Sequence, residues 1–168
     1  MEPDLEGELE RLHPASFAWA LGCCRRNRED AEEVLQTSYL KILEGRARFG
    51  GTASFKTFLF AVIRRTAGEL RRRNFLRAYR LQGLRALEPP SAGAANPEAE
   101  AQVAERLSAL RAALARLPRR QREVLELVLS HEMSLEEAAR TLGITVGSAR
   151  THYERAKKRL ARMLEPRA

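Results

Sequence analysis

The residues whose types and spacing best suit a defined chemistry lie near the C-terminus, and that chemistry is the reading of DNA bases. Arg150, Thr151 and Glu154 are spaced so that one face of a helix carries all three. An arginine can donate two hydrogen bonds to guanine, a threonine can contact a base or the methyl group of thymine, and a glutamate can accept from cytosine N4. The run Lys157–Arg159 that follows is better suited to holding phosphate.

A rigid helix must position these side chains, and the window Leu135–Glu154 fits a helix-turn-helix. A Ser-x-x-Glu capping box at 134–137 opens a first short helix. Gly143 allows the turn, and Thr145 can cap a second helix over 146–164. The alternative interpretation is a plain helical hairpin whose charged face is only solvated. The capping box, the turn glycine and the basic second helix together favour the DNA-binding motif.

Catalytic and metal chemistry find little support. His13, His131 and His152 are far apart in the chain and belong to no H-E-x-x-H or similar array. Neither a glycine-rich phosphate loop nor a G-x-S-x-G sequence occurs. Cys23 and Cys24 are adjacent, lack C-x-x-C spacing and point in different directions from a helix, so we expect them to be buried. We therefore predict no enzymatic activity, no metal site, no cofactor and no small-molecule substrate.

Charge is distributed unevenly along the 168 residues, whose formal net charge is +8. Residues 1–45 carry −5, residues 46–87 carry +10, residues 88–105 carry −4, and residues 106–168 carry +7. Two basic blocks with an acidic spacer indicate two contacts with one polyanion, because clustered Lys and Arg gain affinity by releasing counterions from phosphates. Charge alone leaves open a pair of solvated, Arg-rich helix faces.

The composition favours a folded protein of the cytoplasm. Hydrophobic residues make up 44% and charged residues 31% of the chain. No apolar run approaches the roughly 18–20 residues of a membrane-spanning helix, and Glu2–Glu10 is acidic where a signal peptide is basic. Two cysteines are too few for a disulfide-stapled secreted scaffold.

The chain is predicted to be all-α, with two small helical domains joined by a flexible linker. Apolar spacing is helical on both sides of the stretch 88–97, which contains three prolines and a glycine, and no sustained period-two alternation occurs. We place the first domain at 1–87, the linker at 88–102 and the second domain, the helix-turn-helix, at 103–168. The other expected helices start near Pro14, run from a cap at Asn27 or Asp30 to Gly45, run from Phe55 (capped by Ser54) to about Phe75, and cover 98–116 and 119–129.

The predicted helix from Phe55 has one apolar and one cationic side. Its apolar side carries Phe55, Leu59, Val62, Thr66 and Leu70. Its opposite side carries Thr57, Ala61, Arg64, Gly68, Arg71 and Arg72, with Arg65 flanking. Small residues between the cations would let a nucleic-acid backbone approach closely, so this side suits a phosphate track.

Two stretches resemble one family, the extracytoplasmic-function (ECF) sigma factors of bacterial RNA polymerase. The family's first domain has an Asp-Ala-Glu-Asp-x-x-Gln helix, an Arg-Phe loop and a Phe-x-x-Trp-Leu helix, which resemble Asp30–Gln36, Arg48–Phe49 and Phe55–Leu59 here. Its second domain has Leu-Pro-x-x-x-Arg-x-Val-Leu and a helix-turn-helix ending Val-Gly-(Ser/Thr)-x-(Arg/Lys)-(Ser/Thr), which resemble Leu117–Leu125 and Val146–Thr151. The resemblance covers about residues 15–165 in order.

The resemblance implies a transcription initiation factor that acts stoichiometrically with core RNA polymerase, contacting the β′ clamp helices and the β subunit. Docking on the clamp helices would use Asp30, Glu33 and Gln36. Reading and opening the −10 promoter element, with one base flipped from the non-template strand, would use Thr52, Ser54, Lys56, Thr57, Arg64, Arg65, Gly68, Glu69, Arg71 and Arg72. Reading the −35 element would use Ser148, Arg150, Thr151, Glu154, Arg155 and Lys158. The further partners implied are promoter DNA, at the nucleoid, and an anti-sigma factor that sequesters the protein.

The chain departs from the family pattern at the −10 helix. Phe58 replaces the usual tryptophan, which keeps the apolar bulk but loses the indole donor. Arg64-Arg65 replaces Arg-Asn and Glu69 replaces an aspartate, and these two changes bear on the −10 base preference. No sensing extension follows Leu164, so we expect regulation in trans. The alternative function is a conventional helix-turn-helix regulator that binds DNA independently of polymerase. The discriminating observation is whether the protein binds duplex DNA alone or only confers promoter choice on core polymerase.

Overall fold

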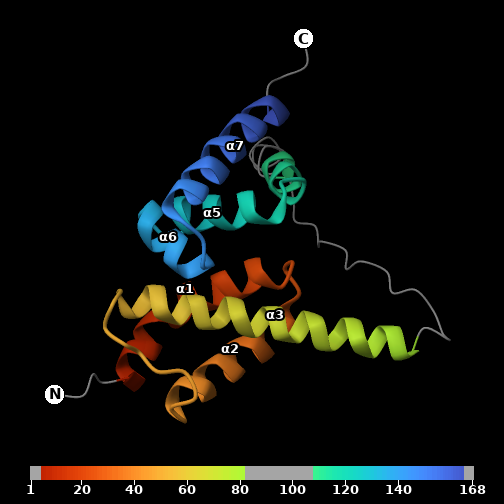
Figure 1. Cartoon of the computed structure of the whole chain (residues 1–168). Coiled ribbons are helices and arrows are strands. Elements are labelled where there is room, and N and C mark those ends of the chain that lie inside the picture. The colour runs from red at the N-terminus through yellow and green to blue at the C-terminus, as the bar shows by residue number, and fades with distance from the viewer. Residues whose placement is uncertain (1–4, 82–107, 165–168) are drawn as a thin grey trace, which may run out of the picture. The chain divides into compact units, whose positions relative to one another are not determined.

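The computed structural model describes residues 5–81 and 108–164, which form two helical bodies (Figure 1). The N-terminal body contains α1 (Leu5–Cys23), α2 (Arg28–Leu43) and α3 (Phe55–Leu81). The C-terminal body contains helical residues 108–115, α5 (Arg119–Leu129), α6 (Leu135–Leu142) and α7 (Val146–Leu164). The regular structure of the described residues is entirely helical, which confirms the predicted fold class. The predicted linker at 88–102 and the predicted start of a helix at 98 lie outside the described residues.

The core of the N-terminal body forms where α1, α2 and α3 pack against one another. Trp19 of α1 is fully buried and stacks on Phe60 of α3, with ring centroids 5.8 Å apart. The indole Nε1 donates a hydrogen bond of 3.0 Å to the backbone carbonyl of Phe60. This bond matters because a buried indole N–H without an acceptor would cost free energy. Trp19 therefore ties α1 to α3 by both apolar contact and a polar bond.

The first helix begins earlier than predicted. Pro14, expected near the start of a helix, lies inside α1. Leu9 and Leu12, which precede it, are buried in the core, so apolar packing holds the first turns in helix although proline cannot donate a hydrogen bond there. The prediction was wrong because a proline marks a helix start only when nothing upstream is buried.

The boundaries of α2 follow local signals. Of the two caps considered, Asn27 serves, because its Oδ1 accepts from the Asp30 N–H at 3.0 Å. The helix ends at Leu43, and Gly45 has φ +69°, the left-handed conformation that terminates helices and that glycine adopts easily.

The third helix is longer than predicted, reaching Leu81 rather than about Phe75. Its predicted cap is confirmed, because Ser54 Oγ accepts from the Thr57 N–H at 3.2 Å. Its C-terminal end extends beyond α1 and α2 (Figure 1), and Phe75 and Leu76 are exposed there. Apolar spacing therefore underestimates its length, since the last turns have no partner in this body to bury an apolar side.

In the C-terminal body, α6 and α7 form the predicted helix-turn-helix. Ser134 and Glu137 satisfy each other's backbone N–H groups, at 3.0 and 3.1 Å, as a capping box does. Gly143 has φ +63° in the turn, and Thr145 Oγ1 accepts from the Ser148 N–H at 3.1 Å. The small residues at the crossing and the inward leucine of α6 are buried: Ala138, Ala139, Leu142 and Ala149. Leu125 of α5 and Ala156 of α7 are buried in one apolar cluster with Leu117, which precedes α5.

Removing this cap should measurably destabilise the C-terminal body. Ser134→Ala is expected to lower the free energy of unfolding by about 1 kcal/mol, because the Glu137 N–H loses its acceptor. Urea unfolding followed by circular dichroism measures this. Ser130→Ala is the matched control, since Ser130 is exposed and only its backbone N–H takes part in the end of α5. Equal stability of the two variants would contradict the role of the cap.

Both cysteines are buried free thiols, as expected from their spacing. Burial, followed by the charge of Asp30, raises the pKa of Cys24 to about 11. Since only the thiolate is a nucleophile, the native protein at pH 8 should react much more slowly with iodoacetamide than the urea-unfolded protein does. Mass spectrometry of the peptide containing Cys24 measures this, and comparable rates in the two states would refute the assignment. The reactivity should rise as the pH approaches 11.

Candidate nucleic-acid and protein interfaces

The predicted polymerase-binding residues lie at the start of α2. Glu33 and Gln36 are exposed, and Asp30 is half-buried. Burial, together with the negative charges of Glu33 and Glu29, raises the pKa of Asp30. These carboxylates therefore repel one another, and a cationic partner surface would relieve that repulsion. The same helix face ends in two exposed leucines, Leu40 at 51% and Leu43 at 49%, which helical spacing alone does not single out as a surface.

The exposed ridge of α3 consists of Arg65, Glu69 and Arg72. Gly68 and Arg64 beside it are half-buried, and the loop residues Thr52 and Ser54 are exposed. A Cβ built on Gly68 would meet only Arg71 Nη2, at an ordinary 3.6 Å. No packing requirement in the described residues therefore demands this glycine, and its small size leaves room for a ligand backbone. Lys56 is half-buried and lies over the ring of Phe60, 5.8 Å from its centroid.

Two residues predicted to bind DNA make structural contacts within the N-terminal body. Thr57 is only 2% exposed, and its Oγ1 lies 2.8 Å from Ser54 Oγ in the cap of α3. The Arg71 guanidinium donates to the carbonyl of Cys23 at 2.9 Å and so holds the end of α1. Thr57 is buried although spacing places it on the cationic side, because α3 packs against both α1 and α2, which makes its buried sector wider than its apolar stripe. We therefore remove Thr57 from the candidate DNA surface, whereas the half-buried Arg71 stays a candidate.

An aromatic cluster holds the loop that precedes α3. Phe49, Phe55 and Phe58 lie with ring centroids 5.5–5.9 Å apart, in tilted and edge-to-face arrangements. All three are half-buried. Phe58, which stands where the family has tryptophan, thus serves here to anchor the loop that carries Thr52.

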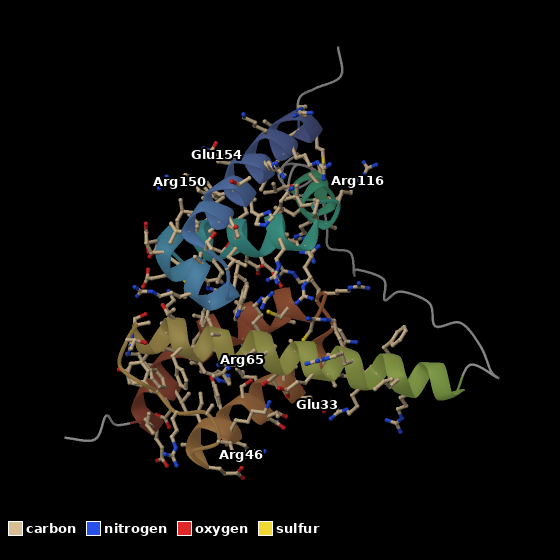
Figure 2. The ribbon with its side chains drawn as sticks, in the orientation of Figure 1. Glu33, Arg46, Arg65, Arg116, Arg150 and Glu154 are labelled. Carbon is tan, nitrogen blue, oxygen red and sulfur yellow. The ribbon has the colours of Figure 1, made fainter. Side chains whose placement is uncertain are left out.

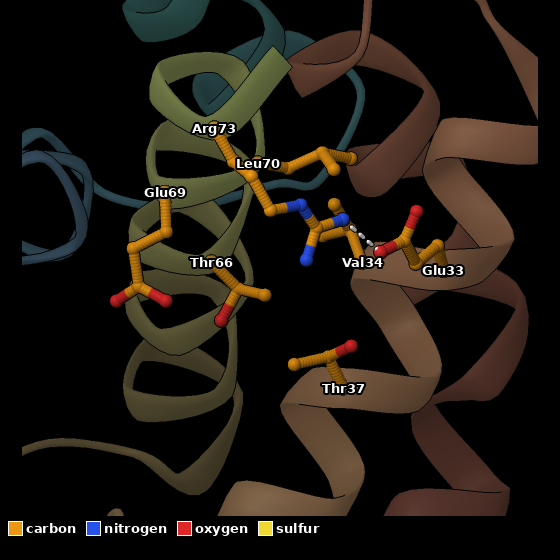
Figure 3. A pocket seen from close by; sticks show the side chains of 7 residues that line it. All are labelled: Glu33, Val34, Thr37, Thr66, Glu69, Leu70 and Arg73. Atoms are coloured by element: carbon orange, nitrogen blue, oxygen red, sulfur yellow. Dashed lines mark hydrogen bonds and ion pairs between the residues drawn. The ribbon is translucent and has the colours of Figure 1, made fainter. Parts of the chain in front are cut away.

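Two ion pairs join α2 to α3 beside a groove of about 280 Å³. The groove is lined by Glu33, Val34, Thr37, Thr66, Glu69, Leu70 and Arg73. Figure 3 shows Arg73 of α3 reaching Glu33 of α2, with which it pairs. Farther along α2, Lys41 Nζ lies 2.5 Å from Glu69 Oε2 and 3.1 Å from Thr66 Oγ1. Sequence reasoning did not pair Lys41 or Arg73 with these carboxylates, because their partners are 28 and 40 residues away and no local pattern links them.

The candidate base-reading residues of α7 are all exposed: Ser148, Arg150, Thr151, Glu154, Arg155 and Lys158. Arg150 and Glu154 project from the same side of the helix (Figure 2). Ala149 and Ala156 face the core, so the remaining face is free for a ligand. Among the described residues, Arg150 has no ion pair or side-chain hydrogen bond, whereas Glu154 lies 3.7 Å from Lys157. This arrangement is one that can enter a major groove.

Comparison with known proteins identifies the family. The model of Sigma-70 region 2 matches residues 9–76, and that of Sigma-70, region 4 matches residues 107–160. The ECF RNA polymerase sigma factor SigM of Mycobacterium tuberculosis, strains Erdman and H37Rv, is 30% identical over 157 residues, which cover 94% of this chain and 76% of SigM. The chain belongs to the ECF sigma factors.

Two solved structures are similar to this sigma factor. One is the sigma factor RpoE in complex with the anti-sigma factor NepR from Bartonella quintana, with a TM-score of 0.74 and 24% identity over 98% of this chain and 99% of that one. The other is CnrH in complex with the cytosolic domain of CnrY, with a TM-score of 0.62 and 25% identity over 96% of this chain and 88% of that one. At 24% identity, the similarity to the RpoE structure shows a shared fold.

Family membership settles the general function. The sigma factor directs promoter recognition by RNA polymerase, so its partners include the polymerase and promoter DNA. The alternative of a helix-turn-helix regulator that binds DNA independently of polymerase is therefore set aside. The N-terminal half of the chain matches Sigma-70 region 2, a domain that such a regulator would not need. The family acts in transcription initiation and not as an enzyme.

The described parts of the sigma factor offer neither a metal cluster nor a membrane span. No group of three or more His, Cys, Asp or Glu side chains in residues 5–81 and 108–164 could hold a metal ion. Within the same ranges, none of the helices combines the length and the apolar character that crossing a bilayer requires.

Proposed function

We propose that this sigma factor divides promoter recognition among three helix faces. The exposed face of α2, with Asp30, Glu33 and Gln36, docks on the clamp helices of the polymerase β′ subunit. The ridge of α3 and the loop before it read and open the −10 element, and α7 reads the −35 element. The protein acts in the cytoplasm, at the nucleoid. The observation that carries the proposal is that these faces are exposed on rigid helices and carry opposite charge, acidic on α2 and mainly basic on α3 and α7.

The −10 surface consists of the predicted residues that remain after burial is considered: Thr52, Ser54, Lys56, Arg64, Arg65, Gly68, Glu69, Arg71 and Arg72. Arg65 and Arg72 on the ridge are placed to hold phosphates, and Glu69 lies between them. Flipping a base out of the stack costs a few kcal/mol, which these phosphate contacts and the polymerase must offset. The −35 surface keeps all six predicted residues, since none of them is buried.

Run-off transcription with core polymerase and a promoter library randomised at both elements tests this division. We expect transcripts only when core and sigma factor are both present, with base preference at two separate elements. Binding of the sigma factor alone to the enriched duplexes should be much weaker than binding of the holoenzyme. The contacts that the sigma factor makes with a single promoter element bury little surface. Transcripts without base preference at either element would contradict the proposal.

We further propose that an anti-sigma factor holds this protein inactive by covering the acidic face of α2 and the basic ridge of α3. Support comes from the two similar structures, of which one is a sigma factor in complex with the anti-sigma factor NepR and the other is CnrH in complex with the cytosolic domain of CnrY. In a host that lacks the genes neighbouring its own, the sigma factor should transcribe its promoters constitutively, and restoring those genes should reduce transcription. Equal transcription with and without them would count against regulation in trans.

A further inference from the structure

We propose that Lys41 of α2 is a positioning residue for promoter reading: it orients the Glu69 carboxylate of α3 toward a base of the −10 element. The inference rests on the proposed role of α3 in reading that element. Lys41 belongs to the helix assigned to the polymerase, so this role would link the two faces of the N-terminal body through one side chain.

The geometry around Lys41 fits a fixed support better than a surface ion pair. Its ammonium lies 2.5 Å from Glu69 Oε2 and 3.1 Å from Thr66 Oγ1, so two groups of α3 one turn apart hold it. Thr66 is only 4% exposed and belongs to the core. The Lys41 side chain is 20% exposed, whereas that of Glu69 is 54% exposed. The lysine is therefore anchored on the buried side of a carboxylate that itself reaches solvent.

Anchoring one oxygen of Glu69 directs the other. A free glutamate side chain has several rotamers, and fixing one of them when a ligand binds costs conformational entropy. Here the bond from Lys41 fixes the carboxylate on folding, before DNA arrives. Glu69 Oε1 accepts no hydrogen bond from the residues that the structure describes, so it can accept one from the amino group of a base.

Lys41 also leaves the neighbouring cations available. Arg65 and Arg72 lie four residues before and three residues after Glu69, positions from which either could pair with it along the helix. In the described part of the chain neither arginine pairs with Glu69. With its Oε2 bound to Lys41, the carboxylate competes less for these two arginines, which can then hold phosphates on either side of the base.

The test compares purified full-length variants with core polymerase in run-off transcription, on a library randomised at the −10 element with a fixed −35 element. Glu69→Gln should relax the preference at one −10 position by about fivefold or more. Lys41→Met should relax the preference at that same position. Lys41→Arg should retain it, because an arginine can also donate to both Glu69 Oε2 and Thr66 Oγ1. Lys41→Met combined with Glu69→Gln should relax it no further than Glu69→Gln alone.

Arg73→Met is the matched control, because it removes the other ion pair between α2 and α3 without touching Glu69; it should leave the −10 preference unchanged. Thermal unfolding of every variant separates stability from reading. If Lys41→Met lowers the unfolding midpoint but keeps the base preference that Glu69→Gln loses, Lys41 is only structural and the inference alone is overturned. If Glu69→Gln alters no −10 position, the proposed role of Glu69 fails, and the inference with it.

Discussion

The sigma factor carrying both Asp30→Lys and Glu33→Lys should bind core polymerase about a hundredfold more weakly than the unchanged protein. The substitutions turn mutually repelling carboxylates, the cause of part of the raised pKa of Asp30, into cations that would face the proposed cationic surface of the polymerase. A hundredfold loss corresponds to about 2.7 kcal/mol, a modest figure for two reversed charges at a protein interface. Fluorescence anisotropy of labelled protein titrated with core polymerase measures the affinity.

A control must show that position matters, and not only net charge. Glu44→Lys makes the same charge change as Glu33→Lys alone, at an exposed residue just past the C-terminal end of α2 and eleven residues from Glu33, so it is the control for that single variant. It should leave core binding within about twofold. Since Asp30 is half-buried, Glu33→Lys alone, at an exposed site, repeats the test with less risk to folding. Unchanged core affinity in the double variant, with its circular dichroism intact, would exclude the α2 face as the docking surface.

The second large effect is expected at the −35 element. Arg150→Ala should lose about 1–3 kcal/mol of discrimination at one base pair, which is roughly 5- to 150-fold in base preference. The loss should concern reading alone, because Arg150 is exposed and has no ion pair or side-chain hydrogen bond with the described residues that its removal would break. Run-off transcription on promoters randomised at −35 measures the preference at each position.

Arg162→Ala is the matched control, since Arg162 is an exposed arginine in the last turn of the same helix. It lies outside the proposed reading face and should shift no base preference. If Arg150→Ala transcribes the same set of −35 sequences as the unchanged protein, Arg150 does not read a base. A uniform decrease across all sequences would instead make it a phosphate contact.

The helix-turn-helix could be predicted from sequence because its signals are local. The capping box at Ser134, the turn at Gly143 and the cap at Thr145 each act over three or four residues, and the structure confirms them. The faces of α7 followed from helical periodicity, since this helix packs on one side only. For the same reason all six proposed −35 residues are exposed as expected.

Where the sequence failed, the cause lies in packing between helices. Thr57 occupies the cationic side of the predicted helix, yet α3 contacts two helices and buries that position. Pro14 carries a local signal for a helix start that the buried leucines before it outweigh. The pairing of Lys41 with Glu69 joins residues that no spacing rule connects, so only the assembled body reveals it.

The stacked, hydrogen-bonded position of Trp19 has a practical consequence for spectroscopy. It is the only tryptophan in the chain, and it belongs to the core of the N-terminal body. Selectively excited indole emission therefore reports the state of that body alone, whereas far-ultraviolet dichroism reports helices in both. Denaturation curves from the two signals will coincide if the whole chain unfolds in one cooperative step, and will separate if the two bodies unfold independently.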